Sequence, residues 1–220
     1  GTFTQVNGSS EEYVVRLNED GTTDPGFTPP FSPGGSFVSG TLALALETDG
    51  DVLVGGGFNN PVTSYLERFS STGVRDSVFG LNANRLDVSG VRSPVYEILP
   101  LQDGKLLVGS SALGAAGLVR LLPDGTRDPD FVWTNGQTAK VVRPNPRGGV
   151  LVFAGADLVA VTDTGGEDPT MPAVQALEVL DLAHDSLGRV TLAGSFTTVN
   201  GTARPYVARL HDVGPPLAVA

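Results

Sequence analysis

Short apolar runs alternate with glycine-containing turns along most of the chain. Four pairs of runs flank such a turn: 42–46 and 52–55, 95–99 and 106–109, 139–142 and 150–152, and 177–180 and 190–192. Short β-rich runs around Asp-Gly or Gly turns predict β-hairpins. The runs are apolar at nearly every position, which is typical of strands that are buried on both faces.

A second pattern recurs after each hairpin and also near the start of the chain. A short strand carries Arg16, Arg68, Arg120, Ala160 or Arg209, and five residues later there is always a glycine. In the first four copies, Asp24, Asp76, Asp128 and Asp168 follow by eight residues, and Phe27, Phe79, Phe131 and Met171 by eleven. Segment 1–8 returns at 194–201 with six of eight residues identical. Such fixed spacing indicates a repeat architecture.

Each copy is predicted to form three strands and a fourth around its Asp-x-x-Phe element. Four antiparallel strands in about 45 residues are typical of a propeller blade. Such a sheet cannot bury both of its apolar faces alone, but neighbouring blades in a ring bury each other's faces. We expect an all-β protein, a β-propeller of about five blades with four as the alternative, built from four-stranded antiparallel sheets. A single domain at 1–214 has copies near 1–40, 41–93, 94–137, 138–173 and 174–214, and 215–220 is expected to link to a missing downstream region.

How the ring closes stays open at this level. The first copy lacks its first strand and most of its second, and the fifth copy lacks its fourth. The two can form a hybrid terminal blade, although they overlap in the Arg-Leu strand. The alternative is that the piece was cut from a longer array.

Several of these motifs resemble a known family. The segments 103–109 (Asp-Gly-Lys-Leu-Leu-Val-Gly), 124–131, 194–201 and 207–210 look like the delta-60 repeat. The resemblance covers almost the whole chain, and it implies propeller-like arrays in large bacterial secreted or surface-attached proteins. It implies no catalytic residues. The copy at 139–171 departs most from the pattern.

The charge and composition of the chain exclude several classes of partner and of chemistry. The 220 residues carry a net charge of −10, with no cysteine and no apolar run long enough for a membrane span. An acidic chain is repelled by phosphate backbones and anionic lipids, so we expect no nucleic acid and no membrane insertion. Without cysteine, disulfides, thiolate nucleophiles and Cys-ligated zinc are excluded.

Few residues are candidates for catalysis or for binding a ligand or metal. The repeated Arg and Asp suggest turn-shaping pairs more than a ring of charges, since a ligand site should differ between blades. Segment 18–24 faintly resembles a calcium loop, but it lacks the final bidentate Glu. The other candidates considered are His184 and His211 for catalysis, 55–57 for phosphate and Trp133 for a sugar. In each case the structural interpretation is favoured.

We therefore expect no enzyme activity, no cofactor and no metal. The expected function is a binding or scaffold module, extracellular or at the cell surface, within a longer polypeptide and with a protein or glycan partner. Variable segments 28–40 and 80–93 are expected to frame a binding face. The alternative is a propeller hydrolase or lyase with its site in the central channel, where Glu47, Glu97 and Glu178 are the few nearby acids.

Overall fold

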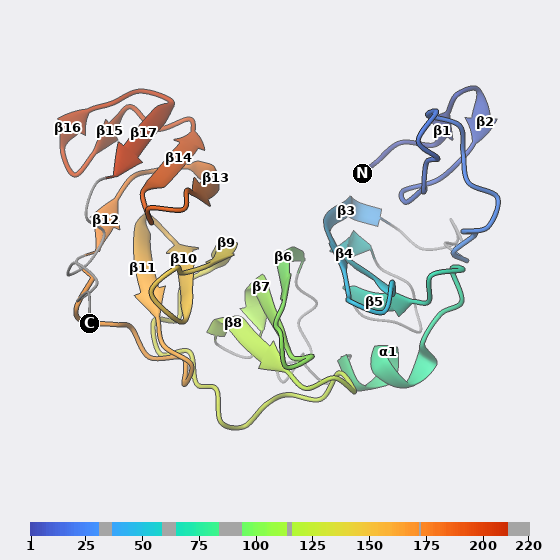
Figure 1. Ribbon diagram of the computed structural model, residues 1–220, viewed down its shortest axis with the longest axis horizontal. Coiled ribbons are helices and arrows are strands. Elements are labelled where there is room, and N and C mark those ends of the chain that lie inside the picture. The colour runs from blue at the N-terminus through green and yellow to red at the C-terminus, as the bar shows by residue number, and fades with distance from the viewer. Residues whose placement is uncertain (31–36, 59–64, 84–93, 114–115, 172, 211–220) are drawn as a thin grey trace.

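Antiparallel sheets follow one another along an arc (Figure 1). The computed structural model describes residues 1–30, 37–58, 65–83, 94–113, 116–171 and 173–210. We name the sheets by the repeat copy that forms them. Blade II contains β3 (Phe37–Leu46), β4 (Val52–Phe58) and β5 (Leu66–Phe69), and blade III contains β6 (Val95–Pro100), β7 (Leu106–Leu113) and β8 (Ala116–Leu121). Blade IV contains β9 (Ala139–Pro144), β10 (Val150–Ala154), β11 (Asp157–Val161) and β12 (Val174–Gln175), and blade V contains β13 (Val179–His184), β14 (Val190–Gly194) and β17 (Val207–Leu210).

The repeated octapeptide forms the same small hairpin at both ends of the arc. It is β1 (Gln5–Val6) paired with β2 (Ser9–Ser10) at one end, and β15 (Thr198–Val199) paired with β16 (Thr202–Ala203) at the other. The only helix in the described residues is α1 (Ser77–Ala83). The prediction of an all-β protein with little helix is confirmed. No helix in this part of the chain combines the length and apolar character that a membrane crossing requires.

The predicted fourth strand is wrong in its placement. The Asp-x-x-Phe element forms a turn, because the aspartate side chain accepts hydrogen bonds from backbone N–H groups just after it. Asp76, for example, accepts from Val78 and Phe79 at 3.0 Å and begins α1. Among the described residues, only blade IV has four strands, and its fourth, β12, follows Met171. Blades II, III and V have three described strands each.

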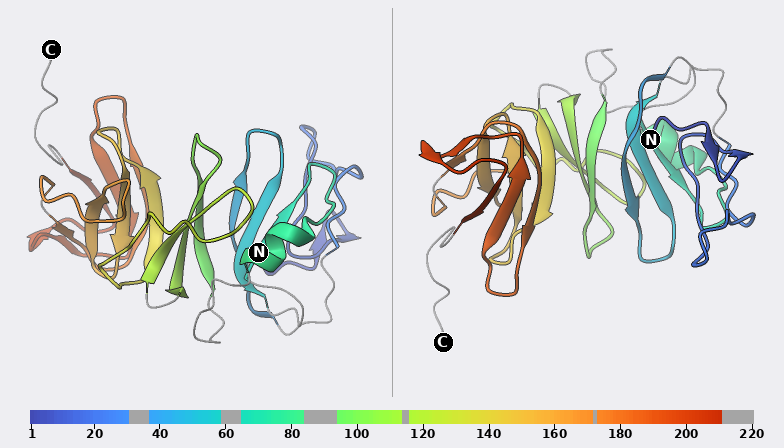
Figure 2. Two further views of the ribbon diagram at one scale, coloured as in Figure 1. Left: turned by 90° about the horizontal axis from the view of Figure 1, so that it is seen from below. Right: turned by 90° about the horizontal axis from the view of Figure 1, so that it is seen from above.

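Four separate apolar cores lie between neighbouring units. The first strands of consecutive blades lie beside one another, β3 by β6, β6 by β9 and β9 by β13, and Figure 2 shows the sheets side by side in a row. Blades II and III share one core, III and IV the next, and IV and V the third. The fourth joins Val14 and Phe27 of the N-terminal segment (residues 1–30) to Val52, Val54 and Phe69 of blade II. The predicted reason for the repeat, burial of each sheet against its neighbour, is confirmed.

The two ends of the arc do not share a sheet in the described part of the chain. In the N-terminal segment β1 pairs with β2, and in blade V β17 pairs with β14. A hybrid terminal blade is therefore not seen there. Blade number and ring closure stay as predictions.

Candidate functional site

Three of the four repeated arginines occupy one register position on a strand, as predicted, whereas the strand predicted around Arg16 does not form. Arg68, Arg120 and Arg209 lie on the third strands of their blades, opposite Leu53, Leu107 and Thr191 of the second strands. Arg16 lies just before the isolated bridge between Leu17 and Thr23.

Three of these arginines make the same contacts within their own copy. Each bonds the aspartate eight residues later, with distances of 2.7 Å for Arg16, 2.6 Å for Arg68 and 2.8 Å for Arg120. Each guanidinium also lies over the aromatic ring of the same Asp-x-x-Phe element, at 4.9, 4.4 and 5.0 Å from the ring centre for Phe27, Phe79 and Phe131. Such cation–π contacts add to the ion pair.

The same guanidinium also reaches the next unit. Arg16 donates to the Ser71 carbonyl at 2.5 Å, Arg68 to the Pro123 carbonyl at 2.8 Å, and Arg120 to the Asp163 carbonyl. These acceptors lie two residues before the turn glycine of the following copy. We call this set of contacts the arginine clamp. It joins neighbouring units, which supports the structural interpretation of the repeated Arg and Asp.

The clamp keeps its aspartates ionised. Hydrogen bonds, the Gly26 N–H first and then Arg16, lower the pKa of Asp24. Burial acts in the opposite direction on Asp128, whose side chain is only 2% exposed. Hydrogen bonds from Lys105, the Asp130 N–H and Arg120 outweigh that burial and bring the pKa of Asp128 to about 2.

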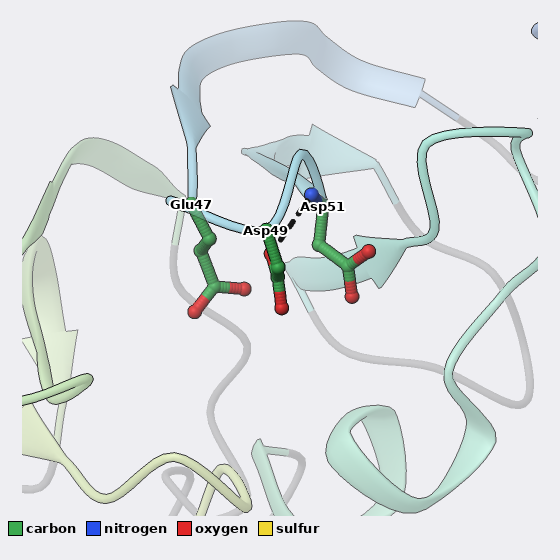
Figure 3. Close-up of side chains that lie close together, drawn as sticks. All are labelled: Glu47, Asp49 and Asp51. Carbon is green, nitrogen blue, oxygen red and sulfur yellow. Dashed lines mark hydrogen bonds between the residues drawn. The ribbon is translucent and has the colours of Figure 1, made fainter.

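An acidic cluster lies at the turn between β3 and β4. Glu47, Asp49 and Asp51 bring carboxylate oxygens within 4.8 Å of one another (Figure 3). Burial, then Arg68 in the opposite direction, then Asp49 and Asp51 act on Glu47, and the net effect raises its pKa. Burial and Asp49 raise the pKa of Asp51. Sequence reasoning named Glu47 but missed its two partners, although the alternating acids of Glu-x-Asp-x-Asp are visible in the sequence.

The cluster offers little to a hard cation by itself. Calcium takes six to eight oxygen ligands, whereas three side chains converge here and Arg68 already lies 3.6 Å from Glu47. The equivalent turn position of Asp51 is Lys105 in blade III and Arg189 in blade V. This is therefore a feature of blade II alone, unlike the clamp.

A second charged group links the first strands of three blades, and we call these first strands the inner strands. Arg143 on β9 bonds Glu97 on β6 and, at 2.6 Å, Asp181 on β13. Burial raises the pKa of Glu97, and the arginine only partly opposes this. Sequence reasoning had Glu97 but not its partners, because residues 38 to 46 positions away give no local signal of contact. The third predicted acid, Glu178, adopts a positive φ of 56° beside the start of β13.

The remaining candidates are structural where they are described. Trp133 is buried in the core between blades III and IV, and its indole N–H points at the Gln137 carbonyl. In 55–57, a Cβ on Gly55 would lie 2.5 Å from Val95, so this glycine lets blade III approach blade II. In 18–24, Asp20 accepts hydrogen bonds from the hydroxyl and the N–H of Thr22, which lower its pKa and shape the turn.

Of the two candidate histidines, the structure describes only His184. His184 is exposed at the end of β13, with Nδ1 3.4 Å from the carbonyl of Asp185. His211, segment 215–220 and much of the two variable segments (31–36 and 84–93) lie outside the described residues. Asn82, at the described start of the second variable segment, donates to the Asp124 carbonyl of blade III.

Comparison with known proteins agrees with this architecture. A family described as "Domain of unknown function (DUF5122) beta-propeller" matches residues 1–27, 101–131 and 188–214. The first range lies in the N-terminal segment, the second contains β7 and β8 of blade III with the turns on either side, and the third contains β14 and β17 of blade V. The delta-60 repeat is not named among the matches, so that resemblance stays an expectation. No curated protein matches the chain.

Three solved structures illustrate the fold. An extracellular domain of a one-component system from B. thetaiotaomicron matches at 16% identity with a TM-score of 0.51, over 94% of this chain and 29% of that one. The virginiamycin B lyase of Staphylococcus aureus matches at 10% identity and 0.51, over 80% and 53%. PorZ, a surface component of the type-IX secretion system of Porphyromonas gingivalis, matches at 15% and 0.51, over 82% and 28%. Such low identities show a propeller-type fold alone, and this chain spans less than a third of the first and third of these proteins.

Proposed function

We propose that this chain is a non-catalytic binding or scaffold module of a larger secreted or cell-surface protein. The observation that carries the proposal is the arginine clamp. The clamp uses the repeated charged groups to join neighbouring units, so the chemistry that recurs through the chain serves the fold. Function then falls to features that differ between copies, and on a rigid repeat scaffold these are the loops.

The comparisons support the same setting. Two of the solved structures are described as an extracellular domain and a bacterial surface component, and this chain spans only 29% and 28% of them. A module of a longer surface protein fits both that setting and the delta-60 resemblance. The net charge of −10 favours cationic or neutral partners, such as a basic protein surface or an uncharged glycan.

Binding to a panel of immobilised glycans and proteins tests this proposal. We expect the chain to be retained by neutral or cationic ligands and not by sulfated glycans. A D49N/D51N variant, which removes two charges from the acidic cluster, should weaken retention by cationic ligands without changing the melting temperature. Equal retention on sulfated and cationic glycans, or no retention on any ligand, contradicts the proposal.

A lyase with an axial site is the second candidate. It is favoured by the group Arg143, Glu97 and Asp181, which lies on inner strands and differs between blades, because a catalytic site needs a cluster of converging charged groups. Structural neighbours include a streptogramin B lyase, at 14% identity and a TM-score of 0.57, over 91% of this chain and 61% of that one. Incubation with streptogramin B followed by mass spectrometry separates the two functions. We expect no product, and turnover that is lost in R143A makes the chain an enzyme.

A further inference from the structure

One leucine of blade II is exposed at a position that is buried in every other blade. Leu44 pairs with Val54 across β3 and β4, as Ile98 pairs with Val108, Val142 with Val152 and Leu182 with Leu192. Leu44 is 59% exposed, whereas its equivalents Ile98, Val142 and Leu182 are 4%, 0% and 2% exposed. In blades III to V the preceding blade covers this position.

The exposed leucine lies on the face that the N-terminal segment covers only in part. Cross-strand partners in a sheet share a face, so Leu44 and Leu46 lie beside Val54 and Val52. Val14 and Phe27 of the N-terminal segment cover these two valines. Among the described residues no such cover reaches Leu44 or Leu46, and Leu46 is 71% exposed.

The N-terminal segment also has an unpaired strand edge. Segment 14–17 is the copy of β5, β8, β11 and β17, each of which pairs with the second strand of its blade. In the described residues, 14–17 has only the bridge from Leu17 to Thr23. The Arg16 carbonyl accepts from Asp24 on that side, so the backbone groups of Val15 and Leu17 point to the other side, where a second strand would lie.

The backbone at Gly1 is already held as a second strand would leave it. The Gly1 nitrogen donates to the Tyr13 carbonyl at 3.0 Å. Gly194, the last residue of the second strand of blade V, donates to the Tyr206 carbonyl at 3.0 Å, and Gly56 in the second strand of blade II donates to the Tyr65 carbonyl at 3.0 Å. A hairpin joined ahead of Gly1 therefore enters the segment in register.

We propose that the leucine face of β3 and the edge 14–17 together bind a two-stranded β-hairpin with the first- and second-strand pattern of this repeat. The second strand of the hairpin pairs with 14–17 by backbone hydrogen bonds, as in β-strand addition. Its first strand places an apolar side chain on Leu44. Blade III shows the required contact, since Leu99 and Leu107 of its hairpin pack in the same core as Val142, the equivalent of Leu44.

The test joins residues 95–109, the blade III hairpin, directly ahead of Gly1 of the full chain. We expect amide exchange at Val15 and Leu17 to slow at least about tenfold and the melting temperature to rise by about 5 °C. The matched control carries L99D and L107D in the added hairpin only, and we expect it to lose both effects.

Leu44→Asp distinguishes the hairpin from other occupants. In the extended chain L44D should cancel the gain in melting temperature, and in the original chain it should leave the melting temperature unchanged because Leu44 is exposed. The proposal is overturned if the extension leaves the exchange at Val15 and Leu17 unchanged. It is also overturned if light scattering shows that the original chain is a dimer that L44D dissociates, because a second copy then covers this face.

Discussion

At the scale of single residues, equivalent arginines should contribute different amounts to stability in different copies. Arg120 and Arg16 have equivalent partners, an aspartate, an aromatic ring and a carbonyl of the next unit. Their surroundings differ, because the Arg120 side chain is 11% exposed and that of Arg16 is 39% exposed. Ion pairs near water contribute little, whereas removing one partner of a buried pair leaves a costly charge.

Arg120→Ala should therefore destabilise the protein more than Arg16→Ala. We expect a loss of about 2 kcal/mol in the free energy of unfolding for R120A, since Asp128 is left buried with Lys105 as its remaining cation. For R16A we expect less than about 1 kcal/mol. Urea unfolding of both variants measures the difference, and equal losses would mean that burial does not set the strength of the clamp.

Asp128 should also make stability depend on acid. Its pKa is about 2 in the folded protein and about 4 in an unfolded chain. A carboxyl group with a lowered folded pKa contributes stability that is complete above its unfolded pKa and is lost as the pH falls through the folded pKa. Between about pH 4 and pH 2 the parent chain should lose more stability than D128N, as chemical unfolding at each pH can measure. Parallel loss in the two chains would contradict this.

At the scale of elements, the tight turn after the third strand of a copy can pack against the backbone of the copy before it. Gly165 has a φ of 90°, and a Cβ there would lie 2.6 Å from the Val132 carbonyl oxygen that follows the previous Asp-x-x-Phe element. Gly21 is the same turn position in the N-terminal segment, with a φ of 85° and nothing within 4 Å. The two glycines share a backbone conformation and differ in whether another unit packs against them.

Replacing each of these glycines with alanine separates the effect of the backbone conformation from the effect of packing against a neighbouring unit. G21A should lower the free energy of unfolding by only about 1 kcal/mol, because alanine is strained in a left-handed backbone conformation. G165A should cost at least about 2 kcal/mol more, because overpacking against backbone forces the neighbouring blade to move. Thermal unfolding of both variants checks this. A cost for G21A as large as that for G165A would mean that the turn in the N-terminal segment is also packed.

At the scale of the whole molecule, ion pairs on the inner strands connect consecutive blades through residues that are distant in sequence. Arg143 of blade IV contacts Glu97 of blade III and Asp181 of blade V. Burial raises the pKa of Glu97, and the hydrogen bond and charge of Arg143 act in the opposite direction, so the arginine favours the ionised form of this carboxyl group.

Arg143→Met should lower the melting temperature by several degrees at pH 7, because it leaves the Glu97 charge partly buried without its partner. Lowering the pH should reduce this loss as Glu97 takes up a proton, since a carboxyl group with a raised pKa favours the folded state in acid. The double variant E97Q/R143M should recover most of the lost stability at pH 7. Additive losses in the double variant would show that the pair is not coupled.

The sequence alone determined the repeat and its local consequences. Apolar runs around turns predicted the hairpins, and the spacing of Arg, Gly, Asp and Phe predicted equivalent positions in successive copies. These features are local or periodic, so they can be read from order along the chain. The fourth strand was misplaced because an aspartate that bonds the backbone just after it favours a turn over a strand.

Only the tertiary structure decided which residues meet across blades. The clamp carbonyls lie 43 to 55 residues from their arginines, and the partners of Arg143 lie 38 and 46 residues away. Leu44 looks like any other strand leucine in the sequence, and its exposure follows from the absence of a covering strand in the described residues. Contacts of this kind depend on how the blades stack, and stacking sums many weak interactions that no short segment encodes.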